Sequence, residues 1–277
     1  MVDFWTKNSV AIYQVSLIGS VVLACLLESF APARAPSRAA GWRWLNNLAL
    51  AVLNHAVLLL VMPLLYLGVV AVLGLQGTGL LRRFDVSPFL AFVILFLCLE
   101  FVGYWIHRAF HAFAPLWRLH AVHHSDTELD FSTAHRHHTL EVILTALATL
   151  PFVLLLGPDV RVLVAYQVVS SWVVALSHAN VSLGVWPNKA LKWLVVTPDF
   201  HRVHHSAEQR YTNSHYGTLS PVFDHMFGTA TPLAQVPGQD MTFGLEYFRE
   251  PSCGRLDRLL ASPFRWPHKQ ATRVPQS

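Results

Sequence analysis

Apolar stretches separated by short polar segments make up most of the chain before residue 178. Each of the first three is long enough to cross a bilayer as a helix, which takes about 20 residues. The last two are shorter and are divided by a polar turn at Pro158, Asp159 and Arg161, so they predict a helical hairpin that enters the membrane and returns. The predicted segments are 9–31, 46–75, 87–106, 140–157 and 162–177.

The first apolar stretch is predicted to stay in the protein as a membrane span. It is too long for the core of a signal peptide, and the residues before it, MVDFWTKN, carry one lysine. The polar, histidine-rich stretch 107–138 begins where the third span ends, so it is expected outside the membrane. The pattern therefore predicts an all-α integral membrane protein with four or five transmembrane helices and a helical cap.

Composition agrees with a membrane protein. Hydrophobic residues make up 53% of the 277 residues and charged residues 13%, against about 25% charged in a typical soluble domain. The net charge of +4 is dispersed along the chain, which suits an anionic membrane surface and gives no sign of nucleic-acid binding. The three cysteines have no paired spacing, so no disulfide framework is expected.

The distribution of arginine and lysine predicts the orientation. An even number of crossings separates the basic loop 34–43 from the histidine-rich segments, so this loop, region 107–138 and the C-terminal tail are expected on one side. That side carries most of the positive charge, which makes it cytoplasmic by the positive-inside rule. Arg82 and Arg83 oppose this assignment because they would face outward. We expect a multi-pass protein of a bacterial inner membrane with its cap in the cytoplasm.

Histidines recur with a spacing that suits a metal site. The stretches WRLHAVHHSD (117–126) and FHRVHHS (200–206) share the pattern HxxHH, and HRAFH (107–111) adds an i, i+4 pair. Positions i, i+3 and i+4 share one face of a helix, so each pattern brings its imidazoles to one side. The candidate ligands are His107, His111, His120, His123, His124, His201, His204 and His205.

Eight neutral imidazoles are enough for two metal ions, because a structural zinc site uses four ligands. Imidazole binds iron, zinc, copper and nickel, so the ligand type does not name the metal. A single HxxxH would more simply be a pair of surface histidines. Three clusters with this spacing favour a di-metal cap.

The order HxxxH, HxxHH and a distant HxxHH resembles the fatty acid hydroxylase/sterol desaturase superfamily of membrane di-iron enzymes. The stretches HHSDTELDFSTAHRHHTLE (123–141), SHAN (177–180), VTPDFHRVHHS and YGTLSPVFDHMFGTA (216–230) are similar to its other patterns, and the likeness covers about residues 90–230. Thr139 stands where the pattern has Pro, and His215 stands where it has Asn. His215 would either add a ligand or change the substrate entrance.

The resemblance also implies that His138 and His178 bind metal. Carboxylates near the clusters are expected to accept a hydrogen bond from the outer N–H of a ligand ring, which fixes its orientation. The residues chosen for this role are Asp126, Glu141 and Asp199, and the alternative is that they form ion pairs with nearby arginines such as Arg136 and Arg202. Glu100 is a further candidate, two turns before His107.

The resemblance implies two iron ions, with zinc as a substitute, and O2 as co-substrate. The expected reaction is hydroxylation or desaturation of a lipid-like substrate (fatty acyl, sterol or isoprenoid, or ether lipid) that enters from the membrane. Phe101, Trp105 and Trp172 are candidates for the lining of its cavity. No haem motif, flavin fingerprint or fused cytochrome domain is visible, so a separate electron-transfer partner is expected.

Three parts follow from these expectations: transmembrane helices in 1–85, a catalytic domain in 86–235 with a transmembrane hairpin at 140–178, and a cytoplasmic tail in 236–277. A zinc-dependent membrane hydrolase and a histidine-rich metal-binding membrane protein remain alternatives. The hydrolase would need a glutamate beside the ligands as in HExxH, where this chain has Arg108. A metal transporter would place its ligands inside the spans.

Overall fold

The computed structural model describes residues 2–37, 39–74, 79–236 and 241–266. Five of its helices are long and apolar enough to cross a membrane: α1 (Val2–Phe30), α2 (Ala40–Leu73), α4 (Pro88–Ala112), α6 (Thr139–Leu156) and α7 (Val160–His178). The described residues form no strand, and Ser206 and Phe243 make an isolated bridge. The predicted all-α membrane fold is confirmed, and each predicted apolar stretch overlaps one of these helices, with bounds that differ at the ends; residue 75, the last of the stretch 46–75, lies outside the described residues.

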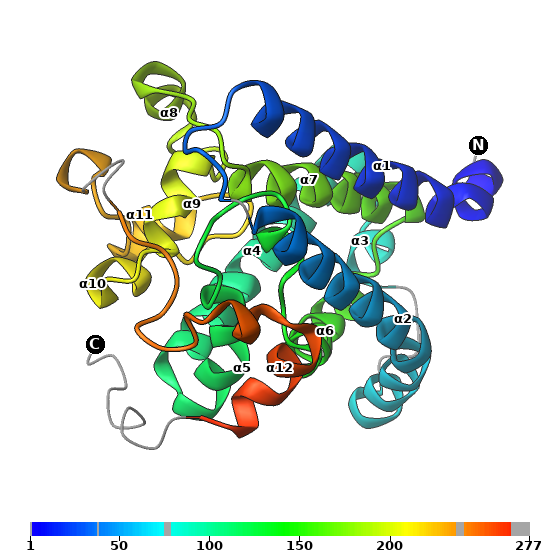
Figure 1. Cartoon of the computed structure of the whole chain (residues 1–277). Coiled ribbons are helices and arrows are strands. Elements are labelled where there is room, and N and C mark those ends of the chain that lie inside the picture. The colour runs from blue at the N-terminus through cyan, green and yellow to red at the C-terminus, as the bar shows by residue number, and fades with distance from the viewer. Residues whose placement is uncertain (1, 38, 75–78, 237–240, 267–277) are drawn as a thin grey trace.

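Shorter helices gather at one end of the long ones (Figure 1). They are α5 (Ala114–His124), α8 (Val185–Leu191), α9 (Pro198–His204), α10 (Gln209–Thr212), α11 (Val222–Phe227) and α12 (Leu256–Ala261). At the other end, α3 (Leu80–Arg83) packs beside the turn between α6 and α7. Gly157 in that turn has a φ of +55°, and a Cβ on the facing Gly79 would lie 2.4 Å from its Cα, so neither position admits a side chain.

The long helices pack in pairs. In Figure 1 α1 runs along α7, and buried Ser16 and Ser171 on these helices place their Oγ atoms 2.9 Å apart. Gly19 of α1 lets the ring of Trp172 approach, since an added Cβ would be 3.6 Å from a ring carbon. The helix α2 packs against α6, and α4 packs against α5, α6 and α7. These contacts hold the cap ends of α4, α6 and α7 close together.

A buried polar network fastens the segment between α5 and α6 to α1 and α2. Arg43 of α2 forms ion pairs with Asp126, at 2.8 Å, and with Asp130. The guanidinium of Arg136 donates to Val122 O and Asn47 Oδ1, each at 2.9 Å. Charged groups at this depth are stable only when paired. The network therefore fixes the loop that follows the first HxxHH motif.

The described part of the C-terminal tail packs on the cap. Leu259 of α12 is buried with Leu50 of α2 and Val122 of α5. The backbone N–H of Leu256 donates to Asn46 Oδ1 at 2.9 Å. The indole of Trp266 packs near Leu245 and Ala121. Residues 241–266 thus cover α5 and the start of α2.

Candidate metal centre

Nine histidines meet where α4, α5, α7 and α9 come together. His107 and His111 lie in the last turns of α4, and the first HxxHH motif ends α5. His178 is the last residue of α7, and the second HxxHH motif lies on α9 and its C-cap. The histidines form a group of five and a group of four, within which the nearest nitrogens lie within 4.8 Å of one another. The first group is His107, His111, His120, His124 and His204, and the second is His123, His178, His201 and His205.

The rings of the first group are oriented by acceptors outside the group. The Nδ1–H of His107 donates to Tyr216 O at 2.8 Å, and that of His204 donates to Ser214 O at 2.7 Å. His120 Nδ1 donates to Glu141 Oε1 at 2.7 Å, and His111 Nδ1 lies 3.3 Å from Asn213 Oδ1. A hydrogen bond from Nδ1 leaves the lone pair on Nε2, which is the arrangement typical of metal-ligating histidines.

The second group has the same character. His178 Nδ1 donates to Val174 O at 2.8 Å, and its Nε2 lies 3.0 Å from His201 Nε2 and 3.3 Å from His123 Nε2. His205 Nε2 lies 3.1 Å from His201 Nε2. All four side chains are buried, so water does not solvate them. The ring nitrogens therefore face one another across a small, dry space.

The arrangement fits a cation in each group. Nε2 of His107 and Nε2 of His120 are 3.0 Å apart although each ring has its hydrogen on Nδ1, so two lone pairs face each other. Ligand nitrogens about 2.1 Å from a shared ion would lie about 3.0–3.4 Å apart in octahedral or tetrahedral geometry. Nε2 of His111 and Nε2 of His204 are buried without a hydrogen-bond partner in the described protein. A bound metal would satisfy these nitrogens.

The protonation states agree with metal binding. Burial lowers the pKa of His123, His124, His201, His204 and His205 well below the ordinary value, and the neighbouring rings lower it further. These imidazoles are therefore neutral at neutral pH. Neutral imidazole is the form that donates a lone pair to a metal ion.

Glu141, the second residue after the start of α6, holds two histidines. Its Oε1 accepts from Nδ1 of His120 at 2.7 Å and from Nδ1 of His137 at 2.9 Å. Although burial opposes protonation of His137, the Glu141 carboxylate raises the pKa of this ring. The ring of His137 also stacks on His123, with centroids 4.3 Å apart. Glu141 thus lies in the position expected of a carboxylate that orients a ligand.

His138 lies away from both groups. Its Nδ1 accepts from the N–H of Leu140 and so caps α6, and its Nε2–H donates to Leu260 O at 3.2 Å. The structure does not bring His138 together with the two groups, because capping turns its ring toward α12. His137 is the histidine of this loop that borders the centre, and the motif HRHH gave no reason to prefer it.

Asp126 and Asp199 also differ from expectation. Asp126 accepts from Arg43, Asn47 and Thr133, and Arg43 keeps its pKa below the ordinary value despite burial. Asp199 pairs with Arg202 at 2.9 Å. Neither carboxylate bonds a histidine among the described residues, so the ion-pair alternative describes both. They hold the chain on either side of the motifs.

Glu100 and His215 fasten the chain after α9. Glu100 Oε2 accepts from the backbone N–H groups of Leu219 and Ser220, each at 2.9 Å. His215 donates from Nδ1 to Phe200 O at 2.8 Å, and its Nε2 accepts from the N–H of Thr231 at 2.8 Å. Its ring stacks on Phe200, and burial lowers its pKa to about 4. His215 is therefore a buried tie between α9 and the chain after α11, outside both histidine groups.

The predicted cavity residues lie on the lipid-facing surface or between helices. Phe101 and Trp105 are exposed on α4 and pack with tilted rings against Phe227 of α11. Trp172 packs against Gly19 of α1. None of the three predicted residues lines the large cavity described below.

Several partners of the ligand rings could not be read from the sequence. The carbonyl oxygens of Tyr216, Ser214 and Val174 are backbone atoms, which carry no residue signature. Tyr216 is the first residue of the stretch YGTLSPVFDHMFGTA, and the resemblance of this stretch to a family pattern is the sequence feature that points to its position. No motif in the sequence points to Asn213 as a partner of His111.

The fold and the site define a multi-pass membrane protein whose histidine clusters could hold metal at the ends of its helices. The fatty acid hydroxylase family model matches residues 92–229, which include every member of both groups. Through this domain the chain belongs to the fatty acid hydroxylase superfamily.

Relatives with different reactions share this region. The chain is 34% identical to ornithine lipid hydroxylase of Rhizobium tropici over 131 residues, 47% of this chain and 38% of the relative. It is 30% identical to alkylglycerol monooxygenase of Homo sapiens over 48% of this chain and 29% of the relative. It is 34% identical to a very-long-chain aldehyde decarbonylase of Oryza sativa over 47% of this chain and 21% of the relative. The matched region therefore spans well under half of each relative. No solved structure matches the chain.

Proposed function

We propose that the chain is a membrane-embedded di-iron enzyme that uses O2 to hydroxylate a lipid-like substrate. The observation that carries this proposal is the pair of buried histidine groups at the cap ends of the membrane helices. The names of two relatives, a lipid hydroxylase and a monooxygenase, support oxygen insertion. Desaturation of the same class of substrate is the second candidate, since it needs the same metals and co-substrate. The substrate class is a fatty acyl, sterol or isoprenoid, or ether lipid.

We assign the first iron to the group of five histidines and the second to the group of four. When bound, the iron pair supplies the reduction of O2 and the cleavage of a C–H bond, chemistry that side chains alone do not provide. The protein keeps the imidazoles neutral by burial. It also directs Nε2 inward through the Nδ1 bonds of His107, His120 and His204. Closely packed rings exclude water from the reacting region.

Substrate entry from the membrane is supported by the position of the exposed aromatics. Trp105 precedes His107 by two residues on α4, and Phe101 lies one turn earlier. Both face outward beside Phe227. An apolar chain that passes along this surface stays out of water while it approaches the histidines. Transfer of each methylene from water is worth about 0.8 kcal/mol, so longer chains should bind more tightly.

Hydroxylation by O2 consumes two electrons and two protons per turnover and releases one water. The proposal therefore includes a separate electron-transfer partner that docks on the cap, on the cytoplasmic side of a bacterial inner membrane. Residues 86–235 would form the catalytic domain between the helices of 1–85 and the tail of 236–277.

Metal analysis and isotope labelling test the proposal together. Purified protein should contain about two iron ions per chain, or zinc after overexpression in its place. Lipids from cells that express the protein under 18O2 should gain one labelled hydroxyl on one lipid class. A new double bond without label would assign desaturation. Hydrolysed lipid with no O2 requirement would support a zinc hydrolase, and unchanged lipids with bound metal would support a metal-binding protein.

A further inference from the structure

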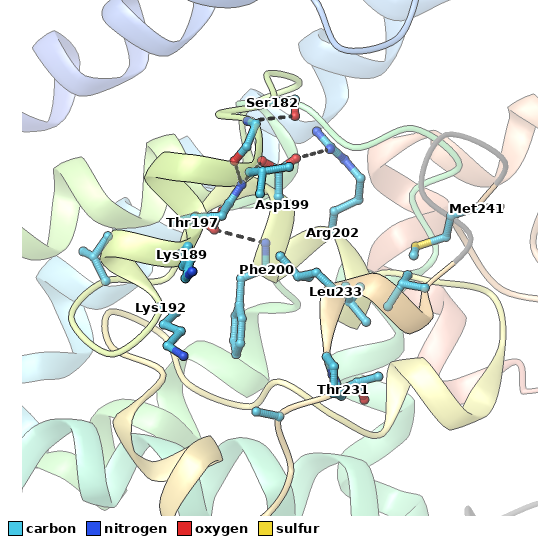
Figure 2. Close-up of a pocket in the computed structure, with 18 of the residues that line it drawn as sticks. Ser182, Lys189, Lys192, Thr197, Asp199, Phe200, Arg202, Thr231, Leu233 and Met241 are labelled. Atoms are coloured by element: carbon cyan, nitrogen blue, oxygen red, sulfur yellow. Dashed lines mark hydrogen bonds and ion pairs between the residues drawn. The ribbon is translucent and has the colours of Figure 1, made fainter.

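A cavity of about 780 Å³ lies between α8, α9 and the chain after α11 (Figure 2). Its volume falls within the range of about 300–1,000 Å³ typical of small-molecule sites. None of the nine clustered histidines lines it. The helix α9 separates the two regions, because it presents Phe200 and Val203 to the cavity and His201 and His204 to the metal groups. A ligand in this cavity would therefore be distinct from the substrate of the metal centre.

Positive charge dominates the lining. The cavity has four basic residues and one acidic residue, and the acid, Asp199, is already paired with Arg202 at 2.9 Å. Arg202 also donates to Val181 O, so its guanidinium is engaged. Lys189 and Lys192 are exposed on and beside α8, at one edge of the cavity in Figure 2. Neither ammonium group has a hydrogen bond or ion pair with a described residue. The edge is therefore ready to accept an anion.

The inner part of the cavity is apolar. Beyond the lysines, the wall consists largely of carbon: Val195, Phe200, Val203, Leu233, Val236 and Met241. In Figure 2, the ring of Phe200 extends into the space between Lys192 and Leu233. Burial of this apolar wall under a hydrocarbon chain is favourable, whereas a free ion would leave the wall uncovered. Charge at one edge and an apolar wall behind it match a molecule with an anionic head and a hydrocarbon chain.

The helix α8 is suited to the membrane surface. It begins shortly after α7 ends at His178, where the last span leaves the bilayer. Trp186 and Trp193 are exposed here, and so are Val185 and Leu194. Exposed tryptophan beside lysine is typical of segments that lie at the lipid–water boundary. The cavity edge is therefore within reach of membrane lipids.

We propose that this cavity binds one anionic amphiphile from the membrane, with its phosphate or carboxylate on Lys189 and Lys192 and an acyl chain on the apolar wall. The occupant is an accessory ligand that contacts the back of α9, the helix that, together with its C-cap His205, carries three of the candidate metal ligands. This site exists whether or not the proposed oxygenase reaction is correct, because its lining shares no residue with the two histidine groups.

Photolabelling of the full-length protein in phosphatidylcholine nanodiscs tests the site. The probe is phosphatidylglycerol with a photoreactive group on its acyl chain, and the labelled residues are mapped by mass spectrometry. Label should appear in 185–203, in 229–236 and at Met241, and should be displaced by unlabelled phosphatidylglycerol. Displacement by palmitate as well would show that a carboxylate also serves as the head. Displacement by glycerol phosphate, which lacks a chain, or equal displacement by excess phosphatidylcholine would overturn the proposal.

Two variants separate head from chain. Each lysine near an anionic lipid contributes about fivefold in affinity, so Lys189→Gln/Lys192→Gln should weaken displacement by phosphatidylglycerol about 25-fold. Arg258→Gln/Arg265→Gln removes the same charge from another exposed part of the cap and should change nothing. Leu233→Trp should block the chain while the lysines remain. Metal content and nanodisc assembly show whether each variant is folded. Unchanged labelling in both folded cavity variants would refute the site.

Discussion

Replacement of Glu141 by Gln tests how the carboxylate supports the first metal group. In the native chain Oε1 accepts from His120 Nδ1 at 2.7 Å and from His137 Nδ1 at 2.9 Å, and the side chain is buried. The amide of Gln keeps an acceptor of similar shape but removes the negative charge. The ring of His120 should then be a weaker donor to metal and should be held less firmly.

The magnitude follows from the hydrogen bonds. A hydrogen bond to a charged group contributes about 1.5–3 kcal/mol, and a neutral one contributes about 1 kcal/mol. The His120 bond should therefore lose roughly 0.5–2 kcal/mol, which corresponds to about 2–30-fold in metal affinity. This agrees with the 10–100-fold losses that follow removal of such partners in other metal sites. We expect Glu141→Gln to bind the metal of the first group about tenfold more weakly.

Titration of metal-free protein with Fe²⁺ or Co²⁺ against a competing chelator measures this directly. Glu246→Gln, at an exposed position, is the matched control and should bind as the native protein does. Two sites should remain in Glu141→Gln, with the first weakened about tenfold and the second weakened less. Loss of a whole site would mean that Glu141 itself binds metal, as the proximity of Glu141, His120 and His137 also allows. Equal affinity in variant and control would refute the reasoning.

Three further predictions use the same preparations. His123→Ala should abolish turnover and lower metal content while the protein still inserts in membranes, whereas His138→Ala should retain both metals; metal analysis that ranks the two variants the other way would contradict the assignment. Arg43→Ala leaves two buried aspartates unpaired and should lower the free energy of unfolding by about 3–5 kcal/mol, as measured by denaturation in detergent. His215 is held neutral in the fold with a pKa of about 4 against 6.5 when exposed, so stability should be lost as pH falls from 6.5 toward 4. His215→Asn should therefore lower the slope of the free energy of unfolding against pH by about 1.4 kcal/mol per pH unit. Denaturation at several pH values measures this slope, and equal slopes in the variant and the native protein would contradict the prediction.

The membrane helices were predictable because hydropathy is a property of long segments. One informative difference is the start of α2 at Ala40, ahead of the predicted residue 46. This first turn contains Trp42 and the charged Arg43, so its hydropathy does not predict a membrane span. Arg43 points inward onto Asp126 and Asp130, so the polar turn is stabilised by a loop far away in the sequence. Hydropathy cannot detect a partner of that kind.

The histidines on helices were placed better than the groups around them. Regular spacing on a helix determines a direction for each side chain, whereas His137 and His138 lie in a loop or at a helix cap. In this segment the backbone conformation determines which ring faces the centre. Asn54 holds that backbone, because it donates to His137 O and accepts from the hydroxyl of Thr139. Asp126 and Asp199 bond arginines in place of histidines for a related reason. Asp126 is two residues beyond α5, and it forms an ion pair with Arg43 of α2.

The repeated HxxHH pattern has a consequence for how the two metals are held. The expectation that each motif directs its histidines to one side holds for positions i and i+4 but not for i+3, because consecutive residues on a helix point about 100° apart and the adjacent histidines diverge. Accordingly, α5 gives His120 and His124 to the first group and His123 to the second, and the motif on α9 gives His201 and His205 to the second and His204 to the first. Each motif thus supplies an i, i+4 pair to one group and its i+3 histidine to the other. The two sites share both helices, so displacement of either helix disturbs both metals. Loss of one metal should therefore weaken the other, a coupling that two independent sites on separate helices would not show.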